Sequence, residues 1–348
     1  MSFMRILHTI LALSLVALAT NVHAGPVDLT AWPDHEAISG QAGELVSYPS
    51  HSPFTLWEVG KSEMLDPPTD ANAFLFMPEA ASADAPVPAV VLLHGAAGVL
   101  SARELTYGAQ FAEMGVAALV VDAFGARRDR AFGFIDRLLE ITETMVLADA
   151  YAGLLYLDDL PEVDGTRVAL MGFSYGGMST MLGAFEQTAE ALNPGGKRFA
   201  AHIAFYGPCI ARFDDIRATG APVLLLAGSE DGIVDPERCH EIVEDLREGG
   251  AEAEFVLYEG AYHQWDGRFP GPRTIGRNLA DCEFNVNDKG VVRDTLTLLP
   301  MTGPFLRKVI LGVCSDSDGY LIGRDDAVRN RSNRDVGAFL MRAFNGDG

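Results

Sequence analysis

A serine near the middle of the chain has the surroundings of an enzyme nucleophile. Residues 172–176, Gly-Phe-Ser-Tyr-Gly, follow an apolar run and precede a helix-like segment. A sharp strand-to-helix turn at this point would hold Ser174 on a strained backbone, and the flanking glycines would leave room for close packing. An ordinary glycine-rich turn is the alternative interpretation. The pattern predicts a nucleophilic Ser174 if proton-accepting partners follow it.

Two candidate partners for the serine lie further along the chain. A serine hydroxyl becomes reactive when an imidazole accepts its proton and a carboxylate orients that imidazole. Asp231 follows the apolar run 222–227 and is the predicted orienting acid, whereas Asp235 is better explained as a helix N-cap. The next apolar run leads to His263, the predicted general base. The order serine, acid, histidine, with each residue after a strand, is typical of α/β-hydrolases.

A second loop could stabilise a negatively charged intermediate. Residues 94–98, His-Gly-Ala-Ala-Gly, follow the apolar run 87–93, where an oxyanion loop would lie. We expect the backbone N–H groups of Ala96 and Tyr175 to be the two oxyanion donors. His94 is a rival general base, but its place in this loop favours a scaffolding role.

The segments that carry these residues alternate between two patterns. Short apolar runs bounded by turn residues are typical of strands buried on both faces of a mostly parallel sheet. They cover residues 73–77, 87–93, 116–121, 167–171, 200–205, 222–227 and 253–258, and helical patterns cover residues 104–114, 136–157, 178–192, 236–248 and 335–344. This alternation predicts an α/β fold, with a doubly wound sheet that has helices on both faces and ligands beyond the carboxyl ends of its strands.

The chain from residue 25 to 348 is expected to form a single domain. Residues 25–70 are polar and proline-rich, so we expect an N-terminal extension that wraps the domain and contains a hairpin. Residues 268–323 interrupt the alternation, and we interpret them as an insertion over one end of the sheet.

The first residues have the pattern of a secretory signal peptide. Arg5 precedes an apolar run that ends near Ala19, and Val22-His23-Ala24 is a small-residue cleavage site. The run is shorter than a bilayer-spanning helix requires, so we expect cleavage after residue 24 and no membrane span in the mature protein. The expected location is the periplasm or the outside of the cell.

Four cysteines follow the predicted cleavage site. They are Cys209, Cys239, Cys282 and Cys314. In an oxidising compartment an even number of cysteines favours two disulfides, although the sequence does not choose among the three possible pairings. No closely spaced cysteine pair suggests a metal site, and we expect none.

The charge balance excludes some classes of partner. The chain has 26 Lys and Arg residues against 48 Asp and Glu residues, a formal net charge of −22. Binding to nucleic acid requires clustered cations, and no basic block occurs. This balance argues against a nucleic-acid partner. The small-molecule partner that we expect follows instead from the candidate catalytic residues, and the sequence does not indicate an oligomeric state.

These features together resemble the dienelactone hydrolase family of α/β-hydrolases. Gly260-Ala261-Tyr262-His263 is similar to the histidine loop of that family, and residues 121–127 are similar to its segment with a substrate-binding arginine. The resemblance implies hydrolysis of an ester or lactone through an acyl-enzyme, without a metal or another cofactor. It also implies substrate binding by Arg127, with Arg268 as a looser match, although Arg127 could instead be structural and paired with Asp122 or Asp129. Trp265 is a candidate for the substrate pocket.

Three differences from that family affect the interpretation. The family has cysteine at the position of Ser174 and glutamate at the position of Gly95, and its members are cytoplasmic. The sequence therefore favours a general carboxylesterase over a dienelactone specialist. Two alternatives stay open: a peptidase of the prolyl-oligopeptidase type, and an exported binding protein that uses a hydrolase fold without catalysis.

Overall fold

An eight-stranded sheet forms the centre of the computed structural model, which describes residues 25–130 and 133–346. The predicted signal peptide lies outside the described residues. In spatial order the strands are β1 (Glu44–His51), β2 (Pro68–Phe76), β4 (Ala117–Val121), β3 (Val87–Leu93), β5 (Val163–Phe173), β6 (Ala201–Phe205), β8 (Val223–Gly228) and β9 (Ala253–Tyr258). β2 is antiparallel to both of its neighbours, and the pairs from β4 to β9 are parallel.

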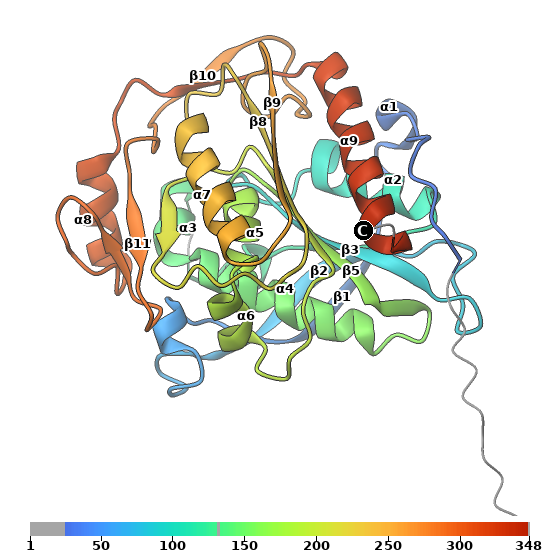
Figure 1. Cartoon of the computed structure of the whole chain (residues 1–348), viewed down its shortest axis with the longest axis horizontal. Helices are drawn as coiled ribbons and strands as arrows, with labels where there is room; N and C mark the ends of the chain where they lie inside the picture. Colours follow the sequence, from blue (N-terminus) through green and yellow to red (C-terminus); the bar gives the residue numbers. More distant parts are fainter. Residues whose placement is uncertain (1–24, 131–132, 347–348) are drawn as a thin grey trace, which may run out of the picture.

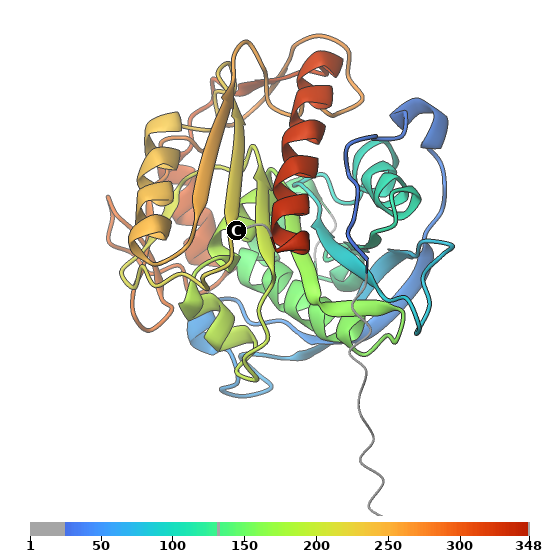
Figure 2. The same ribbon diagram turned by 45° about the vertical axis from the view of Figure 1, so that its right-hand side comes forward.

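Helices cover both faces of this sheet (Figure 1). The helices of the described residues are α1 (His35–Ile38), α2 (Thr106–Glu113), α3 (Phe134–Glu140), α4 (Glu143–Asp158), α5 (Tyr175–Gly183), α6 (Glu186–Leu192), α7 (Pro236–Glu248), α8 (Pro304–Cys314) and α9 (Asp326–Asn345). In the views of Figures 1 and 2, β8 and β9 lie between α7 and α9. The predicted doubly wound α/β fold with helices on both faces is confirmed.

The central strands are where the apolar runs predicted them. Every residue of β4 and β6 is buried, as are all but the first residue of β3, because these strands have helices on both sides. The N-terminal extension contributes β1, which pairs with β2 in register from Glu44 to His51. Most of β2 lies beyond residue 70, so β1 pairs with the first predicted core strand and the expected hairpin is not contained in the extension. Within the described residues, no helix combines the length and apolar character needed to cross a membrane.

Two predicted helices are each divided in the structure. The pattern at 136–157 corresponds to α3 and α4, because Thr142 adopts an extended backbone and its hydroxyl accepts a hydrogen bond from Met145 N–H as the N-cap of α4. The pattern at 178–192 corresponds to α5 and α6. The apolar patterns therefore predicted where helices occur, but they did not predict the break within each pattern.

The last helix begins nine residues earlier than predicted. Asp325 caps α9 by accepting hydrogen bonds from the N–H groups of Ala327 and Val328. The first half of α9 buries polar side chains: Ser332 accepts a hydrogen bond from the Trp265 indole, and Asn333 accepts one from the Tyr107 hydroxyl. A helix whose buried face is polar lacks the apolar periodicity that would have revealed it.

Residues 268–323, which we continue to call the insertion, form small structures of their own. β10 (Arg273–Ile275) pairs with β13 (Tyr320–Ile322), and β11 (Phe284–Val286) lies between β12 (Val292–Asp294) and β7 (Ala211–Phe213). Figure 1 shows this orange and red segment at the side and top of the molecule before the chain enters α9. The sequence prediction missed α8, which lies inside this segment.

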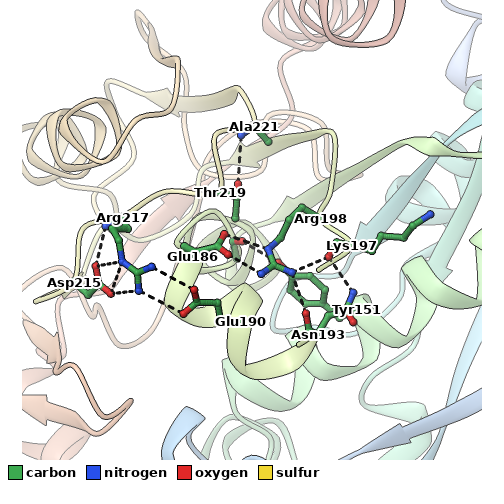
Figure 3. A network of polar contacts seen from close by, with 11 residues as sticks. Tyr151, Glu186, Glu190, Asn193, Lys197, Arg198, Asp215, Arg217, Thr219 and Ala221 are labelled. Atoms are coloured by element: carbon green, nitrogen blue, oxygen red, sulfur yellow. Dashed lines mark hydrogen bonds and ion pairs between the residues drawn. The ribbon is translucent and has the colours of Figure 1, made fainter. Parts of the chain in front are cut away.

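Charged side chains position α6 against its neighbours (Figure 3). Arg198 donates to both carboxylate oxygens of Glu186 in the first turn of the helix, at 2.6 and 3.2 Å. Arg217 donates to Asp215 and Glu190, but its side chain is more than half exposed. Exposed ion pairs contribute less than about 1 kcal/mol each, so the outer part of this network orients α6 more than it stabilises it.

The four cysteines form two disulfides. Cys209 pairs with Cys239 and Cys282 pairs with Cys314. The first joins the segment after β6 to α7, and the second joins two distant parts of the insertion. The predicted number of disulfides is confirmed, and the structure supplies the pairing.

Removing the Cys282–Cys314 disulfide should destabilise the protein. The two cysteines are 32 residues apart, and constraining a loop of that length in the unfolded chain stabilises the folded state by roughly 2–4 kcal/mol. We expect the double variant Cys282→Ser/Cys314→Ser to lose stability in this range, measured by urea unfolding followed by circular dichroism. An unchanged unfolding midpoint and slope would contradict the prediction.

Candidate active site

Ser174 lies in a tight turn between β5 and α5. Its backbone has φ 53° and ψ −112°, and its N–H donates to Phe205 O on the neighbouring strand at 2.9 Å. A Cβ atom on Gly172 would lie 2.1 Å from Gly176 O, and one on Gly176 would lie 2.4 Å from Leu93 O. Only glycine fits at these two positions, because the turn brings the start of α5 against the backbone around it.

Three of the predicted site residues meet at the carboxyl ends of the strands. His263 Nε2 is 2.9 Å from Ser174 Oγ, and His263 Nδ1 is 2.7 Å from Asp231 Oδ2. Asp231 also accepts a hydrogen bond from Ile233 N–H, which fixes its carboxylate. All three residues are buried: Ser174 is 7% exposed, Asp231 3% and His263 0%. This arrangement can transfer a proton from the hydroxyl to the imidazole while the carboxylate holds the ring.

The loop at 94–98 lies directly beside Ser174. A Cβ atom on Gly95 would be 3.4 Å from Ser174 Cβ, and one on Gly176 would be 2.8 Å from His94 O. Among the described residues, neither the N–H of Ala96 nor that of Tyr175 has a hydrogen-bond partner. Both amides are therefore available to a ligand next to the serine.

Side-chain hydrogen bonds fix the backbone of this loop. His94 Nδ1 lies 2.8 Å from Gly95 O, and burial lowers the pKa of this histidine. Glu104, at the end of the π-helical turn Ser101–Leu105, accepts from Leu100 N–H at 2.9 Å and from Gly95 N–H at 3.4 Å. His94 thus lies in the loop itself, while His263 contacts the serine.

The substrate-binding role predicted for Arg127 is contradicted by its surroundings. Its side chain is only 1% exposed, and it donates to both carboxylate oxygens of Asp149 at 2.6 and 3.0 Å. Ser52 Oγ and the carbonyls of His51 and Ala123 accept its other hydrogen bonds. Arg127 is structural, and its partner is Asp149 on α4 rather than Asp122 or Asp129.

Trp265 is likewise a core residue and does not line an open pocket. Its side chain is fully buried, and its indole N–H donates to Ser332 on α9 at 3.1 Å. Its ring packs edge-on against Tyr206 and Tyr258. The looser candidate, Arg268, is exposed and lies against the Phe269 ring.

A buried polar network lies next to the site, and it was not predicted from the sequence. Arg103 pairs with Glu104 at 2.6 Å and lies 3.4 Å from the Tyr206 hydroxyl, which donates to Asp266 at 2.6 Å. Burial raises the pKa of Asp266 and that of Tyr206. This network connects the 94–98 loop to the histidine loop. The adjacent charged residues Arg103 and Glu104, at the start of the predicted helical pattern 104–114, are the signal in the sequence that could have revealed this network.

A cavity of about 620 Å³ opens beside the 94–98 loop. Its lining includes Gly98, Val99 and Phe124, together with the side chains of Arg128 and Arg137. The Phe124 ring contacts His94 and lies near Tyr175, which links the cavity to the serine turn. Among the described residues, no group of three or more histidine, cysteine or acidic side chains is arranged to hold a metal ion.

The part of the chain that matches known proteins includes Ser174, Asp231 and His263. Residues 71–271 match the model of the dienelactone hydrolase family. A Bradyrhizobium sp. protein named as a probable 2-oxo-3-(5-oxofuran-2-ylidene)propanoate lactonase is 21% identical over 197 residues, covering 53% of this chain and 75% of that protein.

Two solved structures are also similar to this chain. Esterase 2 of Thermogutta terrifontis is 18% identical, with 67% of this chain and 87% of that chain covered and a TM-score of 0.48. A dienelactone hydrolase-like promiscuous phosphotriesterase from metagenomic libraries is 20% identical, with 64% and 85% covered and a TM-score of 0.43.

The buried pair formed by Arg127 and Asp149 can be tested by removing one partner. Arg127→Met leaves the Asp149 carboxylate buried without its cation, so we expect a loss of about 3–5 kcal/mol in the free energy of unfolding. The neighbouring variant Arg128→Met is the control, because Arg128 is 82% exposed and should contribute less than about 1 kcal/mol. Urea unfolding measures both variants, and equal losses would contradict the structural assignment.

Proposed function

Because this chain belongs to the dienelactone hydrolase family of α/β-hydrolases, we propose that it is a serine hydrolase that cleaves carboxylic esters or lactones. The observation that carries this proposal is the pair of contacts made by His263. One ring nitrogen faces the Ser174 hydroxyl, and the other faces the Asp231 carboxylate. A neutral imidazole in this position can accept one proton and remain oriented throughout the reaction.

The proposed reaction proceeds in two stages. Ser174 Oγ attacks the carbonyl carbon of the ester while its proton moves to His263 Nε2. The N–H groups of Ala96 and Tyr175 donate to the oxyanion of the tetrahedral intermediate. The carbon–oxygen bond to the alcohol then breaks, and His263 returns the proton to the leaving oxygen.

Water completes the proposed cycle. It attacks the acyl-enzyme while His263 accepts a proton from it, and collapse of the second intermediate returns that proton to Ser174 Oγ. The products are a carboxylic acid and an alcohol, or a hydroxy acid when the substrate is a lactone. Asp231 stabilises the imidazolium in both stages and does not transfer a proton itself.

The cavity beside the oxyanion loop is the proposed place for one side of the substrate. It adjoins Ala97 and Gly98, and its volume of about 620 Å³ suits a small organic molecule. Phe124 is part of its lining, together with Arg128 and Arg137. We propose a small ester or lactone as the substrate.

We also propose that the protein is exported to the periplasm or the medium. Disulfides persist in oxidising compartments, and two are present here. The signal-peptide pattern of residues 1–24 supports the same location. Cell fractionation of a producing strain, with N-terminal sequencing of the mature protein, tests this proposal.

Replacing the proposed nucleophile should abolish turnover. We expect Ser174→Ala to lower kcat for p-nitrophenyl acetate by about 10⁴-fold or more, with an unchanged circular dichroism spectrum. Ser179→Ala is the matched control, because Ser179 lies on the same helix and its hydroxyl donates within that helix, to Tyr175 O. Full activity of Ser174→Ala, or its labelling by a fluorophosphonate probe at the wild-type rate, would refute the proposal.

A further inference from the structure

The histidine loop is paired with a strand from the insertion. His263 N–H donates to Leu321 O at 3.1 Å, and Gly323 N–H donates to His263 O at 3.0 Å. These bonds place His263 beside β13 in the manner of a strand partner. β13 lies outside residues 71–271, the part of the chain that matches the family. The backbone hydrogen bonds that hold His263 are therefore made with a segment outside the region that matches the family.

The same segment also contacts the acid loop. The Asn278 side-chain amide donates to Gly232 O at 2.7 Å, next to Asp231. Backbone bonds between Asn278 and Asp316 tie this contact to the chain that leads into β13. The segment reaches both loops that carry the partners of Ser174.

One side chain of β13 lies directly against the imidazole. The Tyr320 ring is 5.0 Å from the His263 ring, centre to centre, and is edge-on to it at 81°. Tyr206 lies 4.7 Å away in a similar edge-on contact. Tyr206 and His263 are fully buried, whereas Tyr320 is partly exposed.

We propose that Tyr320 is a positioning residue, which holds the His263 ring in the plane that joins Ser174 to Asp231. Both contacts of the imidazole depend on one ring orientation, and rotation of the ring would lengthen both. Aromatic rings next to the imidazole restrict that rotation and exclude water from it.

The phenol of Tyr320 is not expected to exchange protons in the reaction. Burial and the nearby negative charge of Asp231 raise the pKa of Tyr320 to about 12, so it stays neutral at ordinary pH. The contact with His263 is made by the ring, so the ring is the part that we expect to act. Phenylalanine should replace it, and an aliphatic residue should not.

This inference rests on the proposed function, and kinetics with p-nitrophenyl acetate test it. We expect Tyr320→Leu to lower kcat by about 10- to 100-fold, because a small misplacement of a catalytic group has effects of this size. KM should change by less than about twofold, since the ring acts on the base and not on the bound ester. Tyr320→Phe should retain kcat within about threefold. A fall in kcat for the leucine variant but not for the phenylalanine variant identifies the ring as the cause, provided that both variants are folded.

Phe305→Leu is the matched control, because it removes an aromatic ring from a site on the insertion that is 76% exposed. It should leave kcat unchanged. Thermal unfolding verifies that each variant is folded, and Tyr320→Met takes the place of the leucine variant if that one does not fold. Wild-type kcat in a folded Tyr320 variant without the ring would overturn this inference alone. An inactive wild type in which a fluorophosphonate does not label Ser174 would instead overturn the proposed function.

Discussion

A residue other than glycine rarely adopts a positive φ, and holding one there costs roughly 1–3 kcal/mol, which the surrounding structure must offset. Ser174 has φ 53°, and the offset comes from its backbone bond to Phe205 and from close packing at Gly172 and Gly176. The turn places the serine hydroxyl 2.9 Å from His263 Nε2. The approach of β3, β5 and α5 around this turn also brings the 94–98 loop beside it. The geometry of the candidate site thus depends on one unfavourable backbone conformation.

Three charged groups next to this site are buried away from water. Arg103, Glu104 and Asp266 are buried, and each has a partner of opposite charge or a hydrogen-bond donor. Burying a charge is costly unless it is paired, so such a network is tolerated only when its geometry is well defined. Its members come from the turn before α2 and from the histidine loop. The network therefore couples the position of one functional loop to that of the other.

The sequence was sufficient to predict the central strands and the three residues that meet at their carboxyl ends. Strands buried on both faces give continuous apolar runs, and a residue that follows such a run must lie at the sheet edge. The role of Arg127 was mispredicted because its partner, Asp149, is 22 residues away on a helix whose direction the sequence does not reveal. The insertion was equally difficult, because the contact of Tyr320 with His263 joins segments that share no periodic pattern.

The pair formed by Arg127 and Asp149 also constrains how this protein can evolve. Replacing either residue alone leaves a buried charge without a partner, whereas replacing both with apolar residues of similar volume can be nearly neutral. The route between the two states passes through a destabilised intermediate. We therefore expect positions 127 and 149 to change together among related proteins, even though neither side chain contacts the candidate site residues Ser174, Asp231 and His263.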